Sequence, residues 1–232
     1  MLVRSYMTRH PITAGPNLPV VEAQQIMKDN RIKHLPVVDS GKRLLGILTP
    51  SRFSIPADRM TSLDVWEITR RLTHVTVGDL MVKGEALVTI GADATVEDAA
   101  YLLVTRRITG LPVVDTDRVV VGIITRSDLL AELYNLLGAR ESGWRVTVRV
   151  PDRRGEYAKL VQSIHDHGWD LMALGGARSP DTPDHWDVVL KVSRCSDQPS
   201  LVAALEQIEG QTIVDLRCVE VAEAKGGRSD AA

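Results

Sequence analysis

The strongest constraint on the fold of this chain of 232 residues is a sequence repeat. Residues 31–53 read RIKHLPVVDSGKRLLGILTPSRF and residues 107–129 read RITGLPVVDTDRVVVGIITRSDL, so the second block follows 76 positions after the first. Upstream, VRSYM ending at Met7 recurs as VGDLM ending at Met81, 74 positions later, and a two-residue insertion near 91–93 accounts for the difference. The shared order of V-x-x-x-M, LPVVD and G-I-x-T predicts two similar folded units.

Both repeats predict the same elements. Apolar residues at helical spacing predict a helix at 20–27 and another at 96–103. Short β-branched runs joined by turn residues predict hairpin strands. These strands are expected at 36–38, 44–48, 112–114 and 119–124, with a closing helix after each hairpin, clearest at 129–137. A unit of about 55–60 residues buries little apolar surface alone, so we expect the repeats to pack face to face.

Composition and charge limit the class of protein. The 28 Lys and Arg residues nearly balance the 30 Asp and Glu residues, and the net charge of −2 gives no electrostatic basis for a nucleic-acid or membrane partner. No apolar run approaches the roughly 20 residues that span a bilayer, and the first residues lack the apolar core of a signal peptide. Cys195 and Cys218 form neither a disulfide framework nor a metal cluster, so we expect a cytoplasmic protein.

The order of V-x-x-x-M, a helix, an LPVVD strand and G-[IV]-[IL]-T-x-S-D resembles the CBS domain, which occurs in tandem pairs called Bateman modules. The resemblance implies CBS repeat 1 at 1–60, an interdomain helix and linker at 61–76 with its helix near 62–72, and CBS repeat 2 at 77–138. It implies an α/β (α+β) fold in which the repeats pack as a pseudo-symmetric pair. It also implies a regulatory module whose two clefts bind adenine nucleotides or similar ligands, without catalysis.

The second repeat keeps the whole closing motif, and we expect the main ligand cleft there. The Thr125 and Ser127 hydroxyls, with backbone N–H groups at a helix N-terminus, can bind a phosphate, and Asp128 can accept two hydrogen bonds from a ribose diol. By resemblance, further residues of this cleft come from the first repeat: Ile12, Thr13, Ile32 and Lys33. The alternative is that the three polar side chains of the closing motif only cap the helix.

The first repeat departs from the motif at Arg52, which stands where the family pattern has aspartate. A guanidinium group only donates hydrogen bonds, so it cannot accept from a ribose hydroxyl, although Arg52 and His34 could contact a phosphate. The candidate residues of this second cleft are Thr49, Ser51, Arg52, His34, Val88, Ile108 and Thr109. The alternative is a degenerate cleft with a solvated arginine. We therefore expect an asymmetric module with one competent site.

A polar stretch at 138–143 reads as a linker, and the chain beyond it changes pattern. Periodicity predicts the order βαββαβ over 144–222, a ferredoxin-like domain, followed by a disordered tail at 223–232. This order and the turn PDRRGEYAKL resemble the ACT domain, whose usual turn is D-x-P-G-x-L-A. Arg154 replaces the proline, and Glu156 and Tyr157 also depart from the pattern. An amino-acid sensor and a dimerisation domain without a ligand both remain open.

The CBS pair and the ACT-like domain together resemble the acetoin-utilisation B family. We expect a regulatory protein that binds AMP, ADP, ATP or S-adenosylmethionine and signals to an unidentified regulated protein through conformation or oligomeric state. A structural dimer with vestigial clefts is the main alternative. An enzyme is less favoured, because no phosphate-binding loop, nucleophile motif or zinc spacing is present. Leu133, Leu136 and Leu137 predict a homodimer seam, whereas the identity of the ligand and of the partner is not encoded in any motif.

Overall fold

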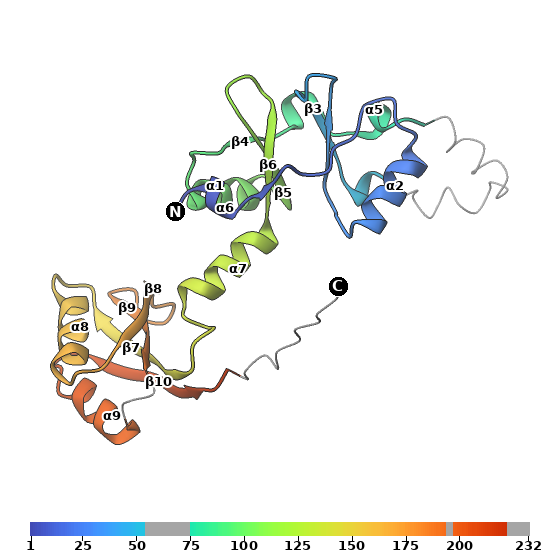
Figure 1. Ribbon diagram of the computed structural model, residues 1–232. Helices are drawn as coiled ribbons and strands as arrows, with labels where there is room; N and C mark the ends of the chain where they lie inside the picture. Colours follow the sequence, from blue (N-terminus) through green and yellow to red (C-terminus); the bar gives the residue numbers. More distant parts are fainter. Residues whose placement is uncertain (54–74, 194–196, 222–232) are drawn as a thin grey trace, which may run out of the picture. The chain divides into compact units, whose positions relative to one another are not determined.

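The structure, a computed structural model, describes residues 1–53, 75–193 and 197–221 (Figure 1). It divides into two compact units, Met1–Leu130 and the chain from Ala131 onward, and the mixed α/β class that the sequence predicts is confirmed. No helix among the described residues is long and apolar enough to cross a membrane. The helix expected near 62–72 and the tail at 223–232 lie outside the described residues.

The first unit contains both repeats, and each supplies the expected helix and hairpin. The first repeat forms α1 (Val3–Tyr6), β1 (Thr8–Arg9), α2 (Val20–Asp29), β2 (Leu35–Val38), β3 (Leu44–Leu48) and the 3₁₀ turn η1 (Pro50–Arg52). The second repeat forms α5 (Val77–Leu80), η2 (Gly84–Ala86), β4 (Ile90–Gly91), α6 (Val96–Thr105), β5 (Gly110–Val114), β6 (Val120–Thr125) and the closing helix α7 (Arg126–Leu136). The sheets have the orders β1-β6-β5-β4 and β2-β3.

The two hydrophobic cores of this unit are built from equivalent positions of the repeat. The first core contains Ala14, Ala23, Met27, Leu35, Val37, Leu48 and Val77. The second contains, in the same order, Ile90, Ala99, Leu103, Leu111, Val113, Ile124 and Val3. Thus the leading segments are exchanged, because Val3 at the start of the first repeat packs in the second core and Val77 packs in the first. Neither repeat completes its core alone.

Backbone contacts hold the exchanged segments in place. Val3 N donates to Ala94 O and Val77 N donates to Leu18 O, both at 2.9 Å. The exchange also explains the glycine of each G-I-x-T motif. A Cβ at Gly46 would lie 2.6 Å from Met81 Sδ, and a Cβ at Gly122 would overlap Met7. The glycine of one repeat therefore makes room for the methionine of the other, which links the two motifs physically.

The aspartate of LPVVD closes each hairpin. Asp39 Oδ1 accepts from the N–H groups of Gly41 and Arg43, both at 2.9 Å. Asp115 Oδ1 accepts in the same way from Asp117 N at 3.0 Å and from Val119 N at 2.8 Å. The backbone strain repeats as well, since Lys42 and Arg118 have φ values of 60° and 64°. The carboxylate supplies an acceptor for N–H groups that have no backbone partner in such a tight turn.

Replacing Asp115 with alanine should destabilise the first unit. The substitution removes the acceptor of two backbone N–H groups at an exposed turn, which should cost about 1 kcal/mol. Asp115→Asn keeps the acceptor oxygen and should be close to neutral. Calorimetry of the full chain measures the effect, and equal melting of the alanine and asparagine variants would contradict this role of the carboxylate.

The second unit has the predicted order βαββαβ. Its elements are β7 (Gly143–Pro151), α8 (Glu156–Asp166), β8 (Leu171–Arg178), β9 (His185–Ser193), α9 (Gln198–Glu206) and β10 (Thr212–Val219). The antiparallel sheet has the order β10-β7-β9-β8, which is a ferredoxin-like topology. Both helices lie on one face of the sheet (Figure 1), over a core that includes Val146, Val148 and Val150.

The opposite face of this sheet is polar. Arg145 pairs with Asp215 at 3.1 Å, and Arg149 pairs with Asp187 through two hydrogen bonds of 2.8 and 3.0 Å. The alternation of valine and polar residues along β7 thus separates a core face from a charged face, as the sequence pattern predicts.

Lys191 on β9 also belongs to this polar face, but unlike its neighbours it is buried. The residue is only 2% exposed, because the turn after α7 covers it, and a Cβ at Gly138 would lie 3.2 Å from Lys191 Cγ. Among the described residues, no hydrogen bond or ion pair reaches the ammonium group. Burial lowers the pKa of Lys191, with Glu141 and Cys218 acting in the opposite direction more weakly. A buried charge without a partner is a cost to folding.

We expect Lys191→Met to raise the melting temperature of the second unit at pH 7. The pKa of Lys191 is lower in the folded chain than in the unfolded chain, so the unfolded chain binds the proton more tightly. The stability of the wild type should therefore rise as pH increases from the lowered pKa towards the ordinary lysine value. The advantage of Lys191→Met should shrink over the same range. Calorimetry between pH 7 and pH 10 tests this.

Lys191→Arg supplies the matched comparison. A guanidinium group stays charged at every pH in this range and is larger, so this variant should melt below the wild type. If Lys191→Met melted lower than the wild type instead, the ammonium group would have to be stabilised in the fold, contrary to this interpretation.

Candidate functional site

The first cavity lies at the start of α7, inside the first unit, and has a volume of about 570 Å³. Six of the seven residues expected in the main cleft line it: Ile12, Ile32, Lys33, Thr125, Ser127 and Asp128. Thr13 does not line it. Both repeats line it: the first supplies Ile12, Ile32 and Lys33, and the second supplies Thr125, Ser127 and Asp128. The volume is suitable for a ligand the size of a nucleotide.

Asp128 is held by two hydrogen bonds from Thr125, the residue before α7. Its Oδ2 atom accepts from Thr125 N at 2.7 Å and from Thr125 Oγ1 at 2.8 Å. The same Thr-x-x-Asp arrangement opens α6 at Thr95 and Asp98. Asp128 thus does cap the helix, as the alternative interpretation predicts, but the cap uses only one of its two carboxylate oxygens. No hydrogen bond reaches Asp128 Oδ1 among the described residues, so that oxygen can accept from a ligand.

Basic side chains line the same cavity, and the motif analysis missed most of them. Arg31 and Arg126 join the expected Lys33, and Arg126 is held by a hydrogen bond of 3.2 Å from Nη2 to Leu103 O. The repeat offers a sequence signal for Arg31, because an arginine recurs at the equivalent position, Arg107. Both residues have left-handed backbone, with φ values of 53° and 54°. Both arginines end a helix and face a cavity.

A second cavity, of about 730 Å³, brings together all seven residues proposed for the second cleft. Besides these seven, the charged lining residues are Lys33, Glu85, Arg106 and Arg107. Arg52 Nε donates to Leu80 O at 3.1 Å, so the guanidinium group is fixed at the cavity rim. The Thr49 and Ser51 hydroxyls lie 3.1 Å apart. The first repeat has Arg52 in place of an aspartate, so it has no carboxylate that could accept from Thr49 as Asp128 accepts from Thr125.

His34 and Thr109 form a wall that both cavities share. The His34 Nε2 and Thr109 Oγ1 atoms are 2.7 Å apart, and a Cβ at Gly110 would lie 2.8 Å from the His34 ring. Gly110 is the repeat equivalent of His34, so the imidazole of one repeat fills the space that the glycine of the other leaves. Burial lowers the pKa of His34, Lys33 lowers it further, and Asp128 opposes both.

In the second unit, the turn before α8 contains Gly155 with a φ value of 86°. The Glu156 side chain that follows is buried and engaged, since Gln211 Nε2 donates to its Oε2 atom at 2.8 Å and Lys159 Nζ donates to Oε1 at 2.7 Å. The hydrogen bonds from Gln211 and Lys159 lower the pKa of Glu156. This carboxylate joins α8 to the segment before β10, which is a structural role.

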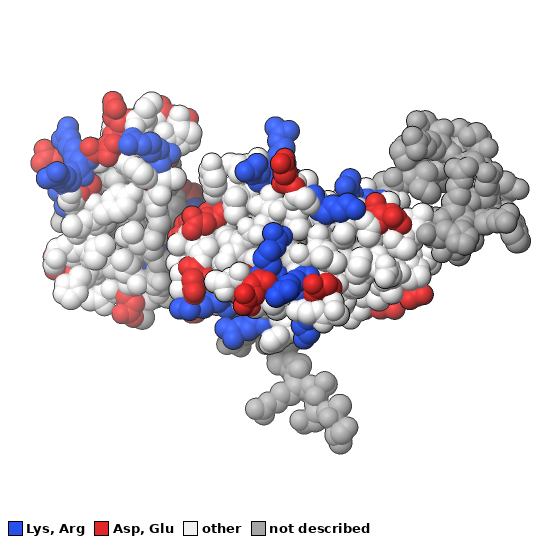
Figure 2. Space-filling view, turned by 90° about the horizontal axis from the view of Figure 1, so that it is seen from above, with Lys and Arg blue, Asp and Glu red and all other residues white. Residues whose placement is uncertain are grey.

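The remaining surface offers no stronger site. Figure 2 shows basic and acidic side chains interspersed over the face it presents, without a broad area of one sign. Within residues 1–53, 75–193 and 197–221, no three His, Cys, Asp or Glu side chains are arranged to hold a metal ion. The two cavities of the first unit are therefore the candidate functional sites.

Comparison with known families identifies the repeats. Residues 3–53 and 77–135 each match the CBS domain family. The predicted tandem pair is thereby confirmed, whereas the ACT-like character of 144–222 stays a prediction.

Three relatives show the range of proteins with similar segments. The L-aspartate semialdehyde sulfurtransferase of Methanocaldococcus jannaschii is 32% identical over 130 residues, which are 55% of this chain and 22% of that enzyme. The chain therefore spans less than a quarter of that relative's length. A solved CBS domain pair in complex with 5′-methylthioadenosine and S-adenosyl-L-methionine is 30% identical and covers 58% of this chain and 96% of its own, with a TM-score of 0.47. A Vibrio cholerae protein described as an acetoin utilization protein is also 30% identical, with coverages of 60% and 93% and a TM-score of 0.49.

Proposed function

We propose that the tandem pair of CBS domains is a regulatory module that binds an adenine nucleotide or a related adenosyl ligand in the main cleft. The observation that carries this proposal is Asp128, which lines the cavity together with apolar side chains and whose Oδ1 atom accepts no hydrogen bond from the described residues. A carboxylate in this position can accept hydrogen bonds from a ribose diol. A regulatory role is favoured over catalysis because the carboxylate beside the Thr125 hydroxyl already accepts from Thr125 N and Oγ1 at the start of α7.

The rest of the cavity supports the same ligand class. The first N–H groups of α7 point to the polar end and favour an anion such as phosphate. Arg31, Lys33 and Arg126 add positive charge there. Ile12 and Ile32 provide apolar surface on which an adenine ring can pack. Diol acceptor, anion site and apolar wall together match the three parts of a nucleotide.

Binding at this cleft acts on the first turn of α7, which continues into the second unit. We propose that a ligand which shares the Asp128 carboxylate changes the stability of this turn, and that a regulated protein or the oligomeric state responds. AMP, ADP, ATP and S-adenosylmethionine are the candidate ligands. No observation in the second unit favours an amino-acid site, since Glu156 is occupied by its own neighbours.

A thermal-shift experiment with Asp128→Ala tests the cleft. AMP at 100 times its dissociation constant should stabilise the wild type by roughly 2.7 kcal/mol, and the variant should lose this shift. The ligand-free variant should also melt lower, because the hydrogen bonds from Thr125 to Asp128 at the start of α7 are lost.

The control is Asp98→Ala, which removes the equivalent hydrogen bonds from Thr95 at the start of α6, away from the cavity. It should lower the ligand-free melting temperature similarly and keep the AMP shift. If neither AMP nor the other three compounds shifts the wild type at millimolar concentration, the nucleotide function is wrong.

We also propose that the protein is a homodimer that associates through α7. Leu133, Leu136 and Leu137 of the predicted seam are 50%, 51% and 39% exposed, and Leu130 on the same helix is 65% exposed. Apolar side chains exposed along one helix in this way usually mark an interface. The polar sheet face of the second unit offers a weaker reason to associate.

Leu133→Glu should convert the dimer to a monomer at tens of micromolar protein, because it places a charge in the apolar contact and loses about 1.5–3 kcal/mol of burial per copy. Val161→Glu on α8, where the wild-type side chain is also exposed, should leave the mass unchanged. Light scattering measures both variants. A monomeric wild-type chain would refute the dimer, and a dimeric Leu133→Glu would place the interface elsewhere.

A further inference from the structure

The second cavity carries an excess of positive charge. Lys33, Arg52, Arg106 and Arg107 line it, and Glu85 is the single carboxylate among its described lining residues. With four positive charges and one negative charge, the formal excess is 4 − 1 = +3, without counting His34. A concave site lined mainly by one sign of charge concentrates ligands of the opposite sign. The charge therefore favours an anion of several negative charges.

Arg52 changes the chemistry of this cavity relative to the main cleft. A guanidinium group offers donors only, so a ribose diol meets no acceptor equivalent to Asp128. The hydrogen bond from Arg52 Nε to Leu80 O uses one donor and orients the group. Its two terminal nitrogens have no hydrogen bond to the described residues, so both can donate to phosphate oxygens.

Arg106 and Arg107 approach from the other repeat, at the end of α6. Arg106 N donates to Leu102 O at 3.0 Å and Arg107 N donates to Val104 O at 3.2 Å, so the backbone of both residues is held by the helix end. Three arginines therefore line one cavity from two separate elements. Each can form a bidentate pair with a phosphate, and linked phosphates satisfy such a set better than one phosphate does.

We propose that the second cleft is a binding site for a ligand with two or more linked phosphates, recognised by Arg52, Arg106 and Arg107. The proposal goes beyond adenosine recognition in the main cleft and does not depend on it, because none of the three arginines lines that cavity. The replacement of aspartate by Arg52 is then a change of specificity from a diol to an anion.

Calorimetric titration of the full chain with inorganic tripolyphosphate tests the proposal. The wild type should bind, and Arg52→Asp should weaken binding about tenfold or more, since charge-assisted hydrogen bonds are lost. Arg107→Asp provides a second variant in case the first does not fold, because aspartate tolerates left-handed backbone better than most residues. Circular dichroism checks that each variant is folded.

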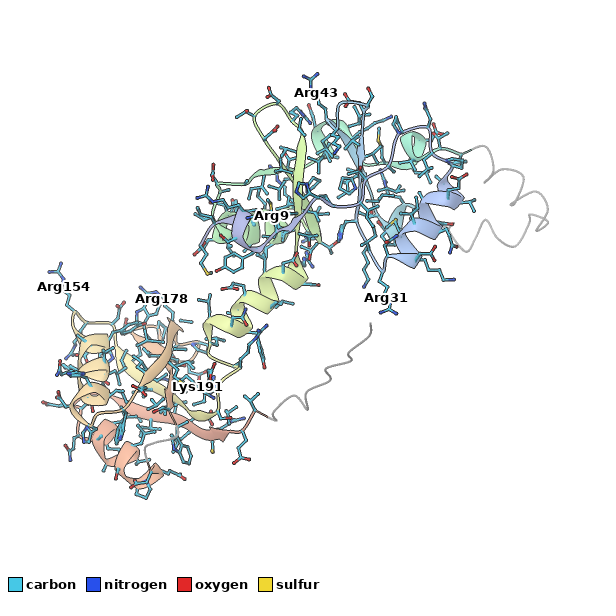
Figure 3. All side chains as sticks on the ribbon, in the orientation of Figure 1. Arg9, Arg31, Arg43, Arg154, Arg178 and Lys191 are labelled. Atoms are coloured by element: carbon cyan, nitrogen blue, oxygen red, sulfur yellow. The ribbon has the colours of Figure 1, made fainter. Side chains whose placement is uncertain are left out.

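The matched control is Arg43→Asp. Arg43 lies at the turn between β2 and β3 and points away from the body of the unit (Figure 3), and it lines neither cavity. It makes the same change of charge, so its affinity for tripolyphosphate should stay within about twofold of the wild type if site contacts rather than net charge decide binding.

Three outcomes would overturn the proposal. One is the absence of tripolyphosphate binding at millimolar concentration. Another is an equal loss of binding in Arg43→Asp and Arg52→Asp, which would make the attraction a general charge effect. The third is competition by AMP together with full binding by Arg52→Asp, which would place the anion in the main cleft. A chain that binds tripolyphosphate but no AMP supports this proposal while the adenosine function fails.

Discussion

The exchange of leading segments is the contact on which the first unit depends. Val3 completes the core of the second repeat and Val77 completes the core of the first, so each repeat supplies a part that the other lacks. A single repeat would expose this apolar gap and leave its β-strand edge unpaired. The exchange therefore makes the pair one folding unit and brings residues of both repeats to each cavity wall.

A symmetric backbone carries chemistry that is not symmetric. The cores use equivalent residues, and the hairpins share an aspartate-closed turn with one left-handed residue. The differences gather at the cavities, where Asp128 is matched by Arg52 and Gly110 by His34. Asp128 and Arg52 line the cavities, and the His34 imidazole fills the space that Gly110 leaves, so the shared backbone accommodates these differences. Duplication thus preserves the frame, while the residues that line the two clefts differ.

Periodicity predicted the helices and hairpins of both repeats because these elements depend on local spacing, as at Val20–Met27 and Val96–Leu103. The family motif gathered most cavity residues, but Arg31, Arg106 and Arg107 escaped it because basic residues at helix ends usually read as solvated. The exchange of Val3 and Val77 is a long-range contact, and no local pattern reports it. Lys191 occupies a polar position of an alternating strand, so its burial depends on the turn at Gly138, 53 positions earlier in the sequence.

The Asp128 carboxylate caps α7 and also lines the cavity. Its Oδ2 atom satisfies the N–H and hydroxyl groups of Thr125 and thereby holds the first turn of α7, while no described residue donates to Oδ1. A ligand diol that donates to Oδ1 adds to this arrangement without breaking the cap, because a carboxylate can accept several hydrogen bonds. Under the proposed function, occupancy stabilises the start of α7 directly. Since the same helix carries the exposed Leu130 and Leu133, the ligand and any partner of this surface act on one element. Two ligands that stabilise the same conformation of one element favour each other's binding.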